Sequence, residues 1–255
     1  HIPREQIDQM VLETAKLLEL DQLLQRYPRD LSGGQRQRIA IGRALVRKPK
    51  LFLMDEPFSN LDPVLRGKLR TELKRIHSKM GTTFIYVTHD QMEAFALGDR
   101  IVVMEHGQIR QVGTPQELFN HPANLYTASF VGTPPMNLFR DVALKQGSDG
   151  WYVTLFDNKY LLPPAKAAGL MAADQGRKVT LGIRPVHITL GDQGIEATVE
   201  HSDVVEAEMH IQLRVGQQEL LAIVPATNFG TFLRGRKVHF QLSPQRFHLF
   251  DPETE

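Results

Sequence analysis

Apolar residues recur at helical spacing at the start of the chain, and short apolar runs alternate with helical patterns up to about residue 130. Residues 4–20 place Ile7, Val11, Ala15 and Leu18 on one face, which predicts an amphipathic helix with an ordinary packing stripe. Apolar periodicity, capping residues and an early proline predict four more helices: 33–46, 63–79, one that begins at Asp90 and one that begins at Thr114.

Between these helices lie two apolar runs that are typical of buried strands. They are "LFLMD" at Leu51–Asp55 and "TFIYVT" at Thr83–Thr88. Strands that alternate with helices indicate a parallel sheet with crossover connections. In such sheets ligands bind beyond the carboxyl ends of the strands, where both runs carry polar residues. A hairpin is predicted over 101–112.

The pattern changes near Gly132–Asn137, where short alternating stretches separated by turn residues take over. Strands are expected to begin near residues 195, 208, 219, 237 and 246, and residues 163–176 predict a short helix. We therefore expect two domains, 1–131 and 132–255. The second is an all-β barrel whose core includes Trp151, Tyr152 and Phe156.

Composition narrows the classes of protein to consider. The 255 residues are 42% hydrophobic and 23% charged, with a net charge of +1, which is typical of a globular chain. The absence of cysteine excludes disulfides and thiolate metal sites, and the ten histidines show no metal-ligand spacing. Because the chain begins with a histidine inside a helical pattern, we expect a fragment or a processed form.

"LSGGQ" places two glycines in the first turn of a predicted helix. Ser32 and Gln35 have the spacing of a capping box, but Gly33 and Gly34 each cost up to about 1 kcal/mol there relative to alanine. Bare backbone at a helix N-terminus suits a closely approaching anion such as a phosphate. From these residues alone, capping and phosphate binding are equally good interpretations.

Carboxylates and a histidine follow the two predicted strands. Asp55 ends the first strand, where a carboxylate can hold Mg²⁺ through water, and Glu56 comes next, where it could polarise an attacking water. His89 follows the second strand and could donate to a terminal phosphate. The alternatives are an exposed acidic pair and a structural histidine, while Asp62 is at least a helix N-cap.

Taken together, these motifs resemble the ATPase domain of ABC transporters. "LSGGQ" matches the family signature, "LFLMDE" the Walker B strand with its catalytic glutamate, "SNLD" the D-loop and "THD" the switch histidine. "MNLF", "GIRP" and "FHLFDPETE" resemble the added OB-like (TOBE) domain of maltose-type sugar-importer ATPases, although Val186 stands where an acid is common. The implied fold is α/β: part of an ABC-type P-loop NTPase domain with a helical subdomain, followed by an OB-like barrel.

The resemblance also implies roles and partners. Ser32, Gly33, Gly34 and Gln35 would contact ATP held by a second ATPase subunit in a homodimer. The remaining expected roles are Mg²⁺ binding for Asp55, general base for Glu56, γ-phosphate binding for His89 and coupling of the two sites for Asp62. The subunit would lie on the cytoplasmic face of the cell membrane against permease subunits, with residues 132–255 open to a regulatory protein.

One expected element does not occur in this sequence. The phosphate loop G-x-x-x-x-G-K-[ST] is missing, so we expect the chain alone not to hydrolyse ATP, although the full subunit would. Two alternatives stay open. One is a non-catalytic regulatory or binding module. The other is an ABC-type ATPase that acts on nucleic acid, which the slightly acidic second half and the lack of aromatic–basic interleaving disfavour.

Overall fold

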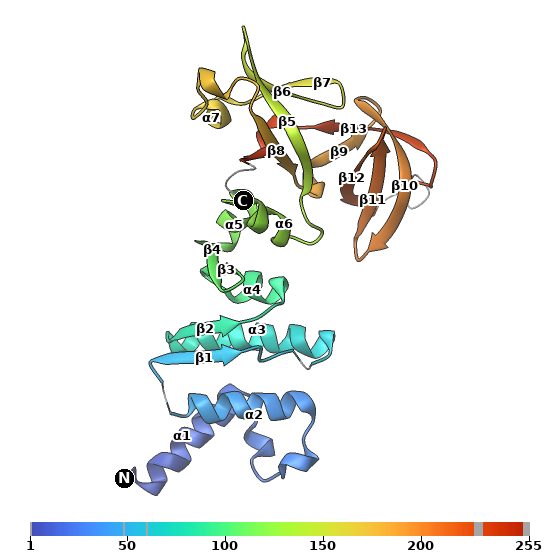
Figure 1. Ribbon diagram of the computed structural model, residues 1–255. Helices are drawn as coiled ribbons and strands as arrows, with labels where there is room; N and C mark the ends of the chain where they lie inside the picture. Colours follow the sequence, from blue (N-terminus) through green and yellow to red (C-terminus); the bar gives the residue numbers. More distant parts are fainter. Residues whose placement is uncertain (1, 48, 60, 227–231, 252–255) are drawn as a thin grey trace. The chain divides into compact units, whose positions relative to one another are not determined.

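The computed structural model describes residues 2–47, 49–59, 61–226 and 232–251 (Figure 1). It divides into two compact units, His1–Ile101 and Val102–Glu255. The division falls thirty residues before the predicted domain boundary at 131/132, which stays a prediction. Each unit has its own hydrophobic core.

The first unit is built from helices and a two-stranded sheet. Its helices are α1 (Arg4–Leu17), α2 (Gly33–Leu45), α3 (Pro63–Met80) and α4 (Gln91–Leu97), with short 3₁₀ turns at Asp21–Leu23 and Pro28–Asp30. Strands β1 (Leu51–Asp55) and β2 (Thr83–Val87) pair in parallel, and α3 connects them, so the predicted crossover arrangement is confirmed.

The two strands are covered on one face only, and β2 only partly, so the prediction of buried strands is corrected. Phe52 and Met54 are buried together with Leu69, Leu73 and Ile76 of α3. Leu53 and Val87 lie on the opposite face and are 68% and 52% exposed. Alternate residues of a strand point to opposite faces, and within this unit α3 covers only one of them.

The stripe of the first helix is also less buried than its periodicity predicts. Ala15 is buried, and so is Leu18 just beyond the helix, but Ile7, Val11 and Leu12 are exposed. The first three turns of α1 therefore present apolar side chains to solvent. A helical period identifies a face, but the tertiary structure decides how much of that face is covered.

The second unit begins with the predicted hairpin and then two short helices. Strands β3 (Ile101–Glu105) and β4 (Gln108–Gly113) are paired, and α5 (Pro115–Asn120) and α6 (Leu125–Phe130) follow. Thr114 and Glu117 form a full capping box at the start of α5, as their spacing predicts.

Two five-stranded antiparallel sheets make up the rest of this unit. One sheet has the order β14-β8-β5-β6-β7 and the other β12-β11-β10-β13-β9. In chain order the strands are β5 (Asn137–Gly147), β6 (Gly150–Leu155), β7 (Asn158–Leu161), β8 (Lys178–Ile183), β9 (Ile188–Gly191), β10 (Ile195–Val205), β11 (Glu208–Val215), β12 (Gln218–Pro225), β13 (Lys237–Leu242) and β14 (His248–Phe250). The predicted short helix is α7 (Pro164–Ala167).

Both sheets contribute to one shared core, which makes the domain barrel-like. Buried side chains from β5, β6 and β8 pack with those from β10, β11 and β13. Strands β12 and β9, at opposite edges of their sheet, are also in contact, so this sheet curls toward closure. Trp151 is buried in the core and Phe156 packs against it, whereas Tyr152 lies outside it with the Lys159 ammonium 4.3 Å from its ring centre.

A buried arginine ties α5 and α6 to the sheets. Arg184 follows β8, is 1% exposed, and donates from Nε and Nη2 to the Phe119 carbonyl at 3.0 and 2.9 Å. Its Nη1 donates to the Val131 carbonyl, and its guanidinium lies 3.9 Å from the Phe119 ring centre. No carboxylate is among these partners, so burial lowers the pKa of Arg184 to about 10.

Candidate active site

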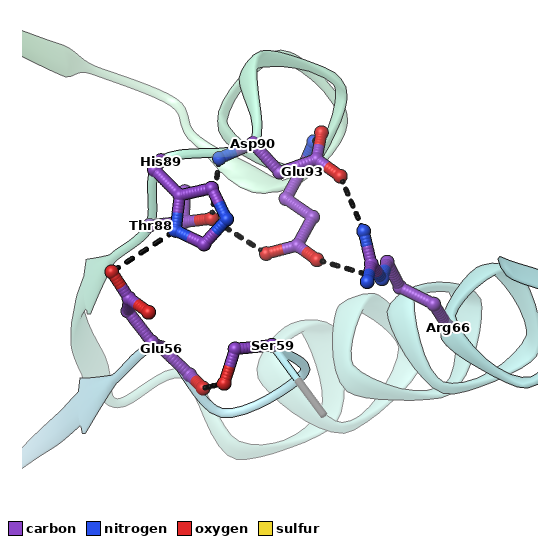
Figure 2. Close-up of a pocket in the computed structure, with 7 residues that line it drawn as sticks. All are labelled: Glu56, Ser59, Arg66, Thr88, His89, Asp90 and Glu93. Carbon is purple, nitrogen blue, oxygen red and sulfur yellow. Dashed lines mark hydrogen bonds and ion pairs between the residues drawn. The ribbon is translucent and has the colours of Figure 1, made fainter. Parts of the chain in front are cut away.

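Two of the predicted catalytic residues meet beyond the carboxyl ends of β1 and β2. The register pairs Asp55 with Val87, and the Glu56 amide donates to the Val87 carbonyl at 2.9 Å. The Glu56 carboxylate accepts a hydrogen bond from His89 Nδ1 at 3.0 Å (Figure 2). The sequence places these residues 33 positions apart, and the parallel pairing brings them together.

The pair is both constrained and accessible. Glu56 has a φ of +41°, in the left-handed region that residues other than glycine rarely adopt, and such backbone clusters at functional sites. The side chains of Glu56 and His89 are 45% and 71% exposed. The hydrogen bond with Glu56 raises the pKa of His89 above its ordinary value of 6.5, and the carboxylate charge adds to the effect.

The signature segment forms a capped helix N-terminus. Ser32 Oγ accepts from the Gln35 amide at 3.3 Å, and Gln35 Oε1 accepts from the Ser32 amide at 2.9 Å, so the capping box is complete. Ser32 and Gly33 are exposed at this end of α2. Capping is therefore confirmed, while phosphate binding at the same atoms stays a prediction.

The two glycines have different surroundings. A Cβ on Gly33 would meet nothing within 4 Å, so no neighbouring residue requires a glycine there. A Cβ on Gly34 would lie 2.7 Å from Leu65 Cδ2 of α3, and Gly34 is buried. The close approach of α2 to α3 therefore accounts for Gly34, whereas from the sequence this glycine was expected only to let a ligand approach.

In the part of the chain that the structure describes, the carboxylates of Asp55 and Asp62 make no hydrogen bond or ion pair with Glu56 or His89. Asp55 is exposed, and among the described residues its carboxylate makes no hydrogen bond or ion pair. Asp62 caps α3 by accepting from the Leu65 amide at 2.9 Å, as its position predicts. Asn60, in the same "SNLD" motif, lies outside the described residues.

A polar network behind His89 was not anticipated from the sequence. Glu93 has the spacing of a capping box with Asp90, but its side chain instead accepts from Tyr86 Oη and Thr88 Oγ1, both at 2.8 Å. Arg66 of α3 forms an ion pair with Asp90 at 3.0 Å. The only signal in the sequence is that Glu93 lies one turn into an apolar helix. It lies on the face that becomes buried when such a helix packs on a sheet.

Comparison with known proteins places this chain in a family. The ABC transporter family model matches residues 3–59, the MalK OB fold domain model residues 132–188 and the TOBE domain model residues 181–250. The multiple sugar-binding transport ATP-binding protein MsmK of Streptococcus mutans is 42% identical over 277 residues, which cover 100% of this chain and 71% of that protein. The chain belongs to the ATP-binding subunits of ABC transporters. Such subunits are ATPases.

Other relatives are also similar over nearly the whole chain. The sn-glycerol-3-phosphate import ATP-binding protein UgpC of Escherichia coli O1:K1 is 43% identical, over 98% of this chain and 69% of its own length. The trehalose/maltose import ATP-binding protein MalK of Thermococcus litoralis is 41% identical, over 99% of this chain and 69% of its own length. The predicted fold class, an ABC-type α/β domain followed by an OB-like domain, is confirmed.

Membership of the family also implies nucleotide binding and association with membrane permeases. None of the described helices has the length and apolar character that crossing a membrane requires. The individual roles expected for Ser32, Gly33, Gly34, Gln35, Asp55, Glu56, Asp62 and His89 stay predictions.

Proposed function

We propose that this chain belongs to the ATP-hydrolysing, energy-coupling subunit of an importer for carbohydrates; because the chain itself carries no phosphate loop, hydrolysis is assigned to the full subunit. The observation that carries the proposal is the Glu56–His89 hydrogen bond beyond β1 and β2, next to a strained Glu56 backbone. Two of the relatives above are named for sugars, which supports a carbohydrate cargo.

Glu56 acts as the general base on the attacking water. The contact with His89 uses one carboxylate oxygen, Oε1, so the second oxygen can accept the proton of a water. His89 Nδ1 donates to Glu56, which fixes the imidazole and directs Nε2 outward from an exposed ring. The raised pKa of His89 favours the imidazolium, in which Nε2 also carries a hydrogen and can donate to a γ-phosphate oxygen while the same contact orients the base.

The N-terminus of α2 receives the phosphate of ATP held by a second copy of the subunit. Capping does not conflict with this role, because Ser32 Oγ accepts from the Gln35 amide and keeps its own hydrogen for a ligand. Gln35 uses its carbonyl oxygen in the cap and keeps its amide hydrogens. The exposed Gly33 adds a backbone donor at the positive end of the helix dipole.

Asp55 is the residue that fits a magnesium ion. Mg²⁺ prefers oxygen ligands and keeps several waters, and the exposed Asp55 carboxylate has no partner among the described residues. When bound, the ion neutralises charge that develops on the phosphates. We place the subunit on the cytoplasmic face of the membrane and assign residues 132–255 to regulatory contacts.

The test of the catalytic assignment is Glu56→Gln in the intact transporter. The amide cannot take a proton from water, so ATP binding should persist while hydrolysis falls roughly 10²–10⁴-fold. ATP binding is measured with a fluorescent analogue and hydrolysis by phosphate release. Turnover at the wild-type rate would overturn the role of Glu56.

The test of the helix end is Ser32→Arg, with Ser32→Thr as its matched control. Arginine fills the space in front of an exposed N-terminus, so hydrolysis should be lost, whereas threonine keeps both the cap and the hydroxyl. Ser32→Thr should unfold like the wild type, and Ser32→Arg should unfold cooperatively with a loss of about 1 kcal/mol, which is the usual cost of a missing N-cap. If Ser32→Arg hydrolyses normally, or loses activity only because α2 unfolds, the site serves capping alone.

A further inference from the structure

Arg66 bridges two loops that the chain separates. It lies in the first turn of α3 and its Nη2 donates to the Leu61 carbonyl at 3.2 Å, in the loop that carries Asp62. Its Nη1 donates to Asp90 Oδ2 at 3.0 Å, and Asp90 directly follows His89 in the chain. One guanidinium therefore holds the start of α3 and the start of α4 at a fixed separation (Figure 2).

A buried carboxylate completes this arrangement from behind. Glu93 is 2% exposed, and its Oε2 accepts from the hydroxyls of Tyr86 and Thr88, while its Oε1 lies 3.8 Å from Arg66 Nε. A buried carboxylate is stable only with such partners. Burial and the hydrogen bond to Glu93 raise the pKa of Tyr86, so the phenol stays a donor.

The residues on both sides of His89 are fixed, while its ring is open. Thr88 Oγ1 donates to Glu93 and accepts from the Asp90 amide at 3.0 Å. Asp90 Oδ1 caps α4 through the amides of Met92 and Glu93. His89 itself is 71% exposed, and Glu56 is its side-chain partner among the described residues. This is the arrangement of a preorganised group, with a rigid support and an accessible reacting end.

We propose that Arg66 is a positioning residue that joins the Asp62 loop to the His89 loop. It keeps the His89 imidazole in place for ATP hydrolysis. It also keeps this imidazole at a fixed position relative to the loop at the start of α3. The path is short and continuous: Leu61 carbonyl, Arg66 guanidinium, Asp90 carboxylate, and then the peptide of His89. The inference rests on the proposed function, because it needs His89 to act on the γ-phosphate.

The first test replaces Arg66 by glutamine in the intact transporter. A misplaced His89 should lower kcat about 10- to 100-fold while the KM for ATP stays within about twofold, because displacements near 1 Å cost such factors in rate. The Hill coefficient for ATP should also fall. Arg70→Gln is the matched control, since Arg70 lies one turn along α3 and makes no ion pair with the described residues.

A second variant asks whether Arg66 acts through Asp90. Asparagine remains a good N-cap, so Asp90→Asn keeps the start of α4 while it removes the charge and replaces the Oδ2 acceptor of Arg66 by an amide nitrogen. If the two residues form one unit, the double variant has the kcat of the slower single variant. Additive losses would overturn the inference. So would a normal kcat in Arg66→Gln accompanied only by a lower melting temperature.

His89→Ala separates failure of this inference from failure of the proposed function. If His89→Ala hydrolyses ATP at the wild-type rate, the catalytic role of His89 is wrong and the inference falls with it. If His89→Ala is inactive while Arg66→Gln turns over normally, the proposed function stands and only the positioning role is overturned.

Discussion

His248 should make the β-rich unit lose stability between pH 7 and pH 5. Its imidazole lies on β14, opposite Gly182 of β8, and is largely buried. Burial is the main reason that its pKa is lowered to about 4, and the positive charges of Lys166, Arg184, His187 and His121 add to the effect. The folded unit therefore holds this histidine neutral.

The sign and size of the effect follow from proton linkage. The unfolded chain binds a proton at this histidine near pH 6.5 and the folded unit only near pH 4, so stability is fully present above 6.5 and is lost as the pH falls toward 4. One pKa unit corresponds to about 1.4 kcal/mol, so acidification from pH 7 to pH 5 should cost about 2 kcal/mol. His248→Gln removes the titrating group, and with it this loss.

The single tryptophan makes the measurement specific to this unit. Trp151 is buried in the shared core of the two sheets, so its fluorescence during urea unfolding reports this unit alone. Unfolding curves at pH 7 and pH 5 are compared for wild type, His248→Gln and the control His201→Gln, which replaces an exposed histidine of β10. At pH 5 most carboxyl groups are still charged, so histidines dominate the difference. An equal loss in wild type and His248→Gln would refute the argument.

Three further outcomes are expected. The pKa of His89, followed by NMR, should lie above 6.5 and return toward it in Glu56→Gln, because the contact with Glu56 raises it; an unchanged value would refute that cause. Arg184→Met should cost the β-rich unit about 3 kcal/mol in urea unfolding, because the Phe119 and Val131 carbonyls lose a buried donor; a loss below about 1 kcal/mol would contradict this. Gly34→Ala should lower the melting temperature relative to Gly33→Ala, since only a Cβ on Gly34 would approach Leu65 Cδ2, to 2.7 Å, and equal effects would disprove the packing argument.

Local pattern was sufficient for most elements of the fold. Periods of 3.6 and 2, together with caps such as Ser32, Asp62 and Thr114, located most helices and strands to within a few residues, but α6 and the strands β5 to β9 were not predicted. The partner of a capping residue was less predictable. Glu93 has capping-box spacing, yet it bonds to Tyr86 and Thr88, because a buried carboxylate accepts from whatever donors the packing supplies.

The candidate site was predictable where its residues follow strand ends. Parallel pairing fixes which residues meet at the carboxyl edge of a sheet, so Glu56 and His89 could be placed together from the sequence. Arg66 was not predictable, since it reaches Asp90 across 24 positions from a helix with other basic residues. Nothing in a helical pattern shows which of several arginines will face another helix.

By itself, the sequence determined the order of the elements, the capped helix ends and the chemistry available at each strand end, because these depend on neighbours within a few positions. Only the tertiary structure decided that Leu65 fills the space beside Gly34, that one face of β1 and β2 is exposed, and that Arg66 and Glu93 support the residues around His89. Those outcomes depend on contacts between segments far apart in the chain, where packing density and burial, not local propensity, set the free energy.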